Sequence, residues 1–303
     1  MNQIATPARE ASGLVVWSAL SAVYLIWGST YLAIRFTVET MPPFVSAAAR
    51  FIVSGVCLYS WRRIARDPAP DKTEWRNAGV IGILLLVGGN GAVVWAARYI
   101  PSSLAALLVT TCPLWLLLFD FIRPGGETPG FNALAGIAAG FCGAVLLIGW
   151  TSEGTTSASF IGSVVVVVGT LFWAAGSIYS KTAKLPSSPL LITGMEMLIG
   201  GGVLLAIAYL VGELATFNIL DVSARSGWAW FYLTAVAPIA FISYAWLLRN
   251  APIPLVATYS YVNPLVAILL GYFLGKEMLA PRVLVAAGLI IGSVVLVSAR
   301  KPR

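Results

Sequence analysis

Long apolar runs alternate with short breaks along the whole chain, and the breaks hold proline, glycine or charged residues. A helix that crosses a bilayer needs about 20 consecutive, predominantly apolar residues. Ten runs have about this length, and they lie near residues 14–37, 43–61, 77–98, 101–122, 130–150, 158–180, 188–211, 227–248, 254–274 and 281–299. The pattern therefore predicts an all-α integral membrane protein with ten transmembrane helices.

The composition excludes a soluble fold. Hydrophobic residues make up 59% of the 303 residues and charged residues only 10%, with a mean hydropathy of +0.87. A soluble globular domain has roughly 25% charged residues, and ten spans with short connections leave no length for one. The first run is too long for the apolar region of a signal peptide and lacks a small-residue cleavage site. We therefore expect it to be retained behind a cytoplasmic tail at residues 1–13.

The positive charges are distributed unevenly between the predicted loops. If both termini are cytoplasmic, the inner segments hold 13 of the 19 lysine and arginine residues and the outer segments hold four, while Arg35 and Arg50 lie within spans. Such an excess in short loops is typical of the cytoplasmic side. We therefore predict a multi-pass protein of the bacterial cytoplasmic (inner) membrane with both termini cytoplasmic. The distribution of the positive charges indicates this topology, and the net charge of +7 does not indicate nucleic-acid binding.

The two halves of the chain repeat one another. A shift of 146 residues places Trp27 on Trp173, Arg35 on Lys181, Pro43 on Pro189, Arg50 on Glu196 and Gly55 on Gly201, and a shift of 151 places Trp95 on Trp246 and Pro101 on Pro252. The repeats are residues 14–150 and 157–303, and each contains five predicted spans. Because five is odd, the second half must enter the membrane from the opposite side. Inverted-topology repeats are typical of transporters, although a membrane enzyme can also arise by duplication.

The fifth and tenth spans share a face of small residues, formed by Gly136 and Gly140 in one and by Gly288 and Gly292 in the other. Small residues at this spacing let two helices approach closely. Such faces could form a homodimer or serve packing within one chain, so both a homodimer and a monomer fit the sequence.

Aromatic side chains with helical spacing lie well inside the spans. Tyr24, Trp27 and Tyr31 share a face of the first helix, and Trp173 and Ser177 occupy equivalent places in the sixth. Trp27 is too deep for the aromatic belt at the headgroups. We therefore expect Trp27 and Trp173 to meet near the repeat axis and to form an aromatic wall around an apolar substrate group. Core packing or lipid-facing positions are the alternative.

Polar residues within the spans are candidate anchors for a substrate. Asn90 is a lone amide in a glycine-rich stretch, and Tyr259 and Asn263 form an i, i+4 pair. Prolines inside spans free the carbonyl four residues earlier, unless threonines or water satisfy it. The affected pairs are Pro113 with Val109, Pro238 with Thr234, and Pro264 with Ser260. The complete set of candidate substrate-binding residues is Trp27, Tyr31, Asn90, Trp95, Trp173, Ser177, Tyr244, Tyr259 and Asn263.

Arg50 and Glu196 are ionisable residues inside spans, at equivalent repeat positions and with opposite charge. Each follows the proline at the start of its helix by seven residues, and the two helices enter from opposite sides. At 1.5 Å per residue, both lie about 10 Å from opposite surfaces of a core about 30 Å thick. A direct ion pair is therefore not expected. Gating contacts, or proton coupling through Glu196, are the functional alternatives, and snorkelling to the nearer interface is the structural one.

Nothing in the sequence indicates a reaction centre. The chain has no histidine, its 12 acidic residues lie mostly in predicted loops, and Cys57, Cys112 and Cys142 all lie within apolar runs. This pattern disfavours a metal site, a cofactor and a catalytic constellation, so an integral-membrane enzyme is the least favoured class.

Several motifs follow one another along the chain. They are YLIWGSTYLAIR in the first span, AAARF ending at Phe51, AARYIPSSLAALLVTTCPLW across the third and fourth spans, and Glu127 and Glu277 after the fourth and ninth. In these motifs the chain resembles the EamA-type transporters of the drug/metabolite transporter superfamily and, within it, the amino-acid exporters of the YddG type. The resemblance implies export by alternating access through a central cavity between the halves, with helices 5 and 10 toward the outside.

The charge inside the spans narrows the substrate. A carrier of phosphorylated sugars needs several arginines or lysines at mid-membrane depth, and only Arg50 lies there. A sparsely polar, aromatic cavity formed by helices 1, 3, 4, 6, 8 and 9 suits a neutral or zwitterionic solute with an apolar part. We therefore expect an exporter of aromatic, hydrophobic and other zwitterionic amino acids and related metabolites, whose partners are these small molecules and the lipid bilayer. A broad exporter of drugs or lipid precursors on the same fold is the alternative.

Overall fold

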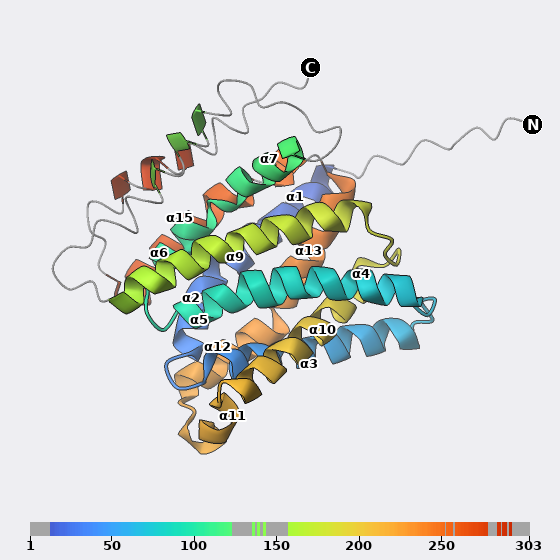
Figure 1. Cartoon of the computed structure of the whole chain (residues 1–303), viewed down its shortest axis with the longest axis horizontal. Helices are drawn as coiled ribbons and strands as arrows, with labels where there is room; N and C mark the ends of the chain where they lie inside the picture. Colours follow the sequence, from blue (N-terminus) through green and yellow to red (C-terminus); the bar gives the residue numbers. More distant parts are fainter. Residues whose placement is uncertain are drawn as a thin grey trace, which may run out of the picture.

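The computed structural model describes residues 13–122, 157–251, 253–256 and 258–277, together with isolated positions in 135–143 and 284–292. These residues form helices joined by turns and contain no strand, as the apolar runs predict. Figure 1 shows the long helices packed side by side in one bundle. Several predicted features lie outside the described residues, apart from those isolated positions: the spans at 130–150 and 281–299 with their glycine faces, Glu127 and the N-terminal tail.

Six helices within the described residues are long and apolar enough to cross a membrane, and they coincide with predicted spans one to three and six to eight. They are α1–η1–α2 (Gly13–Ala22, Val23–Trp27 and Gly28–Thr37), α3 (Pro43–Ile64), α4–η2–α5 (Lys72–Gly82, Ile83–Asn90 and Gly91–Ala96), α9 (Ser157–Thr182), α10 (Pro189–Leu210) and α12–α13 (Ala224–Ala235 and Ala237–Asn250). The fourth and ninth predicted spans are interrupted helices, α6–α7 (Ser102–Val109 and Cys112–Ile122) and α14–α15 (Ile253–Val256 and Tyr259–Phe273). Two short helices, α11 (Glu213–Thr216) and η3 (Ile219–Asp221), follow α10.

The break between α6 and α7 follows from Pro113, which cannot donate a backbone hydrogen bond. Thr110 and Thr111 occupy the break. Their hydroxyls donate to the carbonyl oxygens of Leu107 and Leu108 at 2.5 and 2.8 Å. The threonines thus bond to carbonyls of the turn before the proline, and these two bonds do not include the carbonyl of Val109, which the proline frees.

A second break separates α12 from α13 beside Pro238. The carbonyl of Thr234, four residues earlier, accepts a hydrogen bond from the Ser54 hydroxyl of α3 at 2.7 Å. The carbonyl that this proline frees is therefore bound by a neighbouring helix, which ties α12 to α3.

Two spans contain a π-helical segment in their interior. η1 covers Val23–Trp27 and η2 covers Ile83–Asn90, so the wider turns end at Trp27 and at Asn90. π-helical turns inside α-helices are rare and occur frequently at functional sites. Both segments therefore end at a candidate substrate contact, although the apolar pattern of the sequence contains no sign of either.

Helices α3 and α10, which lie side by side in Figure 1, pack through small residues at equivalent repeat positions. A methyl group on Gly55 would lie 3.1 Å from the carbonyl oxygen of Gly194, and one on Gly201 would lie 3.2 Å from that of Ala48. The 146-residue shift exchanges these two contacts. Reciprocal contacts of this kind are expected where a two-fold axis relates two helices.

A carboxylate that follows α15 closes the N-terminus of α6. Glu277 accepts hydrogen bonds from the backbone N–H and hydroxyl of Ser102 at 2.9 and 2.7 Å, and from those of Ser103 at 3.1 and 2.6 Å. Its Oε1 also lies 2.7 Å from Nη1 of Arg35 in α2. These four residues, the Glu277 cluster, join the ends of α2 and α15 to the start of α6.

Candidate substrate-binding site

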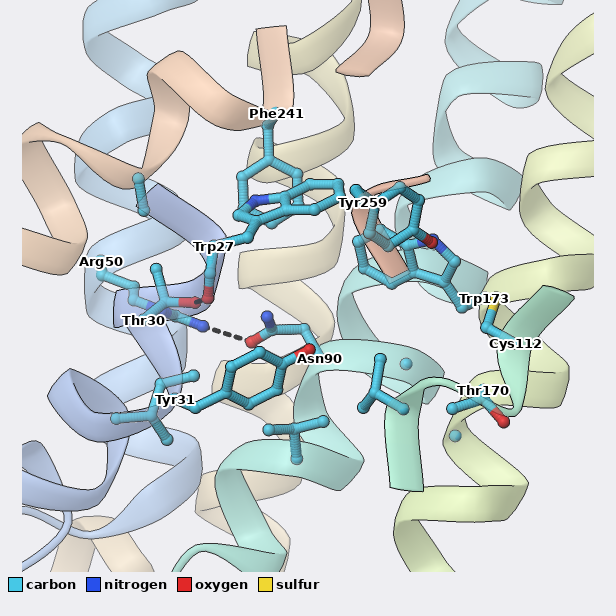
Figure 2. Close-up of a pocket in the computed structure, with 16 residues that line it drawn as sticks. Trp27, Thr30, Tyr31, Arg50, Asn90, Cys112, Thr170, Trp173, Phe241 and Tyr259 are labelled. Atoms are coloured by element: carbon cyan, nitrogen blue, oxygen red, sulfur yellow. Dashed lines mark hydrogen bonds between the residues drawn. The ribbon is translucent and has the colours of Figure 1, made fainter. Parts of the chain in front are cut away.

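A cavity lies between helices from both halves of the chain, and Figure 2 shows its lining. It contains about 640 Å³ of space that no protein atom fills, open solvent at its mouth included. The main aromatic and polar lining residues are Trp27, Thr30 and Tyr31 from the first span, Arg50 from α3, Asn90 from η2, Cys112 from α7, Thr170 and Trp173 from α9, Phe241 from α13 and Tyr259 from α15. The expected helices therefore contribute, and the second span joins them through Arg50.

Trp27 lies at the centre of an aromatic cluster. Its ring centroid is 5.4 Å from those of Trp173, Phe241 and Tyr259, and 4.9 Å from that of Tyr244. The ring planes meet at 50° to 85°, in the tilted and edge-to-face arrangements that aromatic pairs favour. Trp27 and Trp173 thus meet as expected, and the rings of Trp27, Trp173, Phe241 and Tyr259 form an aromatic wall of the cavity.

Seven of the nine candidate residues lie in or directly behind this lining. Five line the cavity, and they are Trp27, Tyr31, Asn90, Trp173 and Tyr259. Tyr244 stands one layer behind, with its ring against Trp27 and Tyr259, and its hydroxyl is hydrogen-bonded to Ser177 at 3.1 Å. Ser177 and Tyr244 therefore support the aromatic wall from behind.

Trp95 and Asn263, the other two candidate residues, are not among the lining residues of this cavity. Trp95 packs against Tyr99, with 4.8 Å between ring centroids. Because Trp95 follows Asn90 by five residues, its side chain leaves the helix about 140° around the axis from that of Asn90. The Asn263 amide, oriented so that its nitrogen donates, lies 3.1 and 3.2 Å from the carbonyl oxygens of Tyr24 and Tyr259. The NH2 group of Asn263 therefore joins the first span to α15 and is occupied by backbone carbonyls.

Arg50 is the charged residue of the lining, and it is only 3% exposed. Its Nη2 donates to Oδ1 of Asn90, as the dashed line in Figure 2 shows, and its guanidinium carbon lies 4.4 Å from the centre of the Phe51 ring. Its Nε has no hydrogen-bond acceptor among the described residues. No ion pair joins Arg50 to Glu196 within the described residues. Glu196 is buried in α10, where the backbone of α4 packs against it at Gly82.

Sequence reasoning did not single out Thr30, Cys112 or Gly169, which also line the cavity. The glycine-rich stretch of η2 was the sequence signal for a close approach at this point, but the sequence did not decide whether a ligand or another backbone approaches. In the structure the approaching backbone is that of α9 at Gly169. A methyl group on Gly89 would lie 2.8 Å from Cε3 of Trp173, and one on Gly169 would lie 3.2 Å from the Gly89 carbonyl oxygen. The glycines therefore let η2 and α9 approach closely and bring Trp173 beside Asn90.

The lining is suited to recognition of a small molecule. Among its sixteen residues one is cationic and none is acidic, and the other polar groups are hydroxyls, one amide, one thiol and two indole N–H groups. No group of three His, Cys, Asp or Glu residues that could hold a metal occurs in the described part of the chain. The geometry therefore offers an aromatic surface, a few neutral hydrogen-bonding groups and one positive charge.

A helical membrane bundle that encloses such a cavity between its two halves has the architecture of a small-molecule transporter. The model of the EamA-like transporter family matches residues 14–149 and again residues 160–299. The chain therefore belongs to the EamA-like transporter family, whose members have two repeats of five helices. The resemblance seen in the sequence motifs is thus confirmed.

Relatives of known name agree with this assignment. The inner membrane transporter YedA of Escherichia coli K12 is 37% identical over 291 residues, which cover 95% of this chain and 92% of YedA. A transporter of Archaeoglobus fulgidus is 26% identical, with 85% of this chain and 88% of its own covered, and PecM of Dickeya dadantii is 24% identical, with 90% and 88% covered. A crystal structure at 22% identity has the same fold, with a TM-score of 0.67 over 95% of this chain and 99% of its own.

Proposed function

We propose that this transporter exports amino acids, both aromatic or hydrophobic ones and other zwitterionic ones, and related metabolites, across the inner membrane by alternating access. The observation that carries the proposal is the aromatic wall around Trp27, in a cavity with one cation and no acidic side chain among its described lining residues. Ring faces attract apolar and aromatic substrate groups, and a single buried cation suits a single carboxylate. A substrate with more negative charge would lack partners here.

We also infer that residues 14–150 and 157–303 are inverted halves with both termini in the cytoplasm. The reciprocal glycine contacts of α3 and α10 and the contact of Trp27 with Trp173 support the two-fold relation. The excess of lysine and arginine on one side supports the orientation. Such halves can exchange conformations, so that a site between them opens to either face in turn.

The test is uptake of labelled amino acids into proteoliposomes that contain the purified chain, with and without an imposed pH gradient, against empty liposomes. Saturable uptake of several amino acids is the expected result. Uptake that does not respond to the gradient indicates a facilitative exporter, and uptake that requires it indicates proton coupling, for which Glu196 is the candidate residue. No uptake by folded protein contradicts the proposal and favours a drug or lipid-precursor exporter.

Two variants connect transport to the cavity. Trp27→Ala and Trp173→Ala remove rings from the wall, and each should lower uptake by about tenfold or more, as truncation of a central aromatic contact does. Trp61→Ala is the matched control, because Trp61 is 57% exposed and lies at the far end of α3. Wild-type uptake by both folded cavity variants would exclude the aromatic wall as the substrate site.

A further inference from the structure

Arg50 is a buried cation that lacks a carboxylate partner among the described residues. Only Asn90 accepts a hydrogen bond from it, the face of Phe51 lies beneath its guanidinium, and its Nε has no acceptor in the described part of the chain. The half-buried cation Arg35, by contrast, has Glu277 at 2.7 Å. Arg50 therefore retains donor capacity inside the protein that the described residues do not use.

An unpaired charge inside a membrane protein is costly, and such residues pair with other groups or mark a substrate path. The planar guanidinium presents parallel N–H donors whose spacing matches the two oxygens of a carboxylate. Arg50 faces the cavity together with Asn90 (Figure 2). It also borders a second, smaller space of about 170 Å³ next to Thr37 and Ser46. A carboxylate that enters the cavity can thus reach the cation from within.

The opposite end of an amino acid has no such partner. None of the sixteen lining residues is acidic, so the described lining contains no carboxylate for an ammonium group. The charged side chain among these lining residues is Arg50, so an ammonium group in the cavity would face a positive charge. The cavity is therefore electrostatically asymmetric, with attraction for an anionic head and repulsion for a cationic one.

We infer that Arg50 and Asn90 form the docking site for the carboxylate of an organic monoanion, whose apolar or aromatic part packs against Trp27, Trp173 and Phe241. The inference rests on the proposed function of this cavity as the substrate site and deepens it. The carboxylate is the group that the site requires, and the α-ammonium group is dispensable. Aromatic monocarboxylates without an amino group are thus substrates of the same site.

Three compounds with the same phenyl group separate the contribution of the carboxylate to binding from that of the ammonium group. 3-Phenylpropionate has the carboxylate alone, L-phenylalanine has both groups, and phenethylamine has the ammonium alone. Binding is measured as the rise of the unfolding midpoint of the purified full chain in detergent with increasing ligand. This readout is preferable to transport, because weak acids and amines cross a bilayer unaided in their neutral forms. We expect 3-phenylpropionate and phenylalanine to bind and phenethylamine not to bind.

Arg50→Gln should weaken the binding of both carboxylates at least tenfold. Arg50→Lys keeps the charge without the planar fork and should weaken it less, and it carries the test if the glutamine variant does not fold. Arg225→Gln is the matched control, because Arg225 is exposed and its ion-pair partner Glu39 lies 3.6 Å away outside the cavity lining. This control should bind both carboxylates like the wild type.

Two results overturn the inference: binding of 3-phenylpropionate that is unchanged in both Arg50 variants, or binding of phenethylamine as tight as that of 3-phenylpropionate. The outcomes also separate it from the proposed function. If 3-phenylpropionate binds through Arg50 and phenylalanine does not bind, the amino-acid proposal fails and the carboxylate site stands. If phenylalanine and phenethylamine bind without 3-phenylpropionate, the carboxylate site fails and the amino-acid proposal stands. If none of the three binds, both fail.

Discussion

Glu277 and Arg50 are both buried charges, and they differ in how fully the surrounding residues satisfy them. The Glu277 carboxylate accepts four hydrogen bonds from Ser102 and Ser103 and forms an ion pair with Arg35. Within the described part of the chain, Arg50 has one accepting side chain, Asn90, and its Nε has no acceptor. A buried charge with a full set of partners stabilises one arrangement of helices, whereas one that lacks partners and faces a cavity is available to a ligand.

The two charges also differ in what they join. Glu277 connects the end of α2 to the start of α6 and the end of α15, so it fixes three helices at one end of the bundle. The bond of Arg50 with Asn90 joins α3 to η2 beside the cavity. Substitution of Glu277 should therefore weaken the folded state more than it weakens substrate binding. Substitution of Arg50 should weaken substrate binding more than it weakens the folded state.

Glu277→Gln tests the stabilising half of this comparison and has the largest expected effect. The amide keeps one oxygen as an acceptor, but its NH2 group must face N–H or hydroxyl donors, and the charge opposite Arg35 is lost. Buried hydrogen bonds to a charged group contribute about 1.5–3 kcal/mol each, so we expect the free energy of unfolding to fall by about 2–4 kcal/mol. The measurement is unfolding of the purified protein in detergent.

Glu39→Gln is the control for Glu277→Gln. Glu39 and Arg225 form an ion pair of 3.6 Å in which both side chains are more than a third exposed, and such pairs contribute about 0–1 kcal/mol. The unfolding midpoint of this variant should stay near that of the wild type. An equal loss in both variants would mean that burial of Glu277 adds nothing, and the comparison would fail.

Acidification should remove the contribution of Glu277 without any substitution. Burial raises the pKa of this carboxyl group, but the hydrogen bonds from Ser103 and Ser102 outweigh it and hold the pKa below its usual value of 4.5. Because the pKa is lower in the folded state than in the unfolded state, the stabilisation is complete above the usual value. It is lost as the pH falls through the folded-state pKa.

The difference in unfolding midpoint between wild type and Glu277→Gln should therefore narrow as the pH is lowered from 7 to about 3. Other carboxylates with a lowered pKa, such as Asp67 and Asp71, are present in both proteins. Their effect therefore cancels when the unfolding midpoint of the variant is subtracted from that of the wild type. A difference that stays constant over this range would show that the charge of Glu277 does not act through these hydrogen bonds.

Arg50→Met tests the other half of the comparison through stability alone. A methionine fills a similar volume and removes the cost of burying an unpaired charge, which offsets the loss of the hydrogen bond to Asn90. We expect the free energy of unfolding to change by less than about 1 kcal/mol or to rise. A loss as large as that of Glu277→Gln, measured in the same detergent, would mean that Arg50 has a structural role like that of Glu277.

The sequence predicted the arrangement of this site better than its details. The apolar runs located the helices, and the 146-residue shift anticipated the contact of Trp27 with Trp173, because period and repetition are properties of the chain itself. The apolar pattern could not reveal η1 and η2, since an α-helix and a π-helix have the same composition. These wider turns end at Trp27 and Asn90 and thereby help to set the lining.

The sequence also could not predict the hydrogen-bond partners of the polar residues within the spans. Asn90 and Asn263 are both buried amides in apolar spans, yet Asn90 faces the cavity and Asn263 lies against two backbone carbonyls. Arg50 was assigned to gating or snorkelling, and its role beside Asn90 depends on the packing of α3 against η2. Such contacts depend on the rotation of each helix about its axis, which tertiary packing decides after the spans have formed.

Trp95→Phe gives the smallest expected effect and sharpens the boundary of the site. Trp95 belongs to the same residue type as Trp27 and lies five residues from Asn90, but it packs on Tyr99 outside the lining. Phenylalanine preserves an aromatic pair with Tyr99, so stability should fall by no more than about 1 kcal/mol. The affinity for phenylalanine, measured by the ligand-induced rise in unfolding midpoint, should stay within about twofold, a change of about 0.4 kcal/mol.

Trp27→Phe is the partner measurement for Trp95→Phe, because the exchange is chemically identical. Trp27 contacts four other rings, and a smaller ring at its position leaves space between Trp173, Phe241 and Tyr259. Its affinity for phenylalanine should therefore change more than that of Trp95→Phe. If the two variants lose affinity equally, the substrate extends past Asn90 to α5, and the boundary of the site must be drawn to include Trp95.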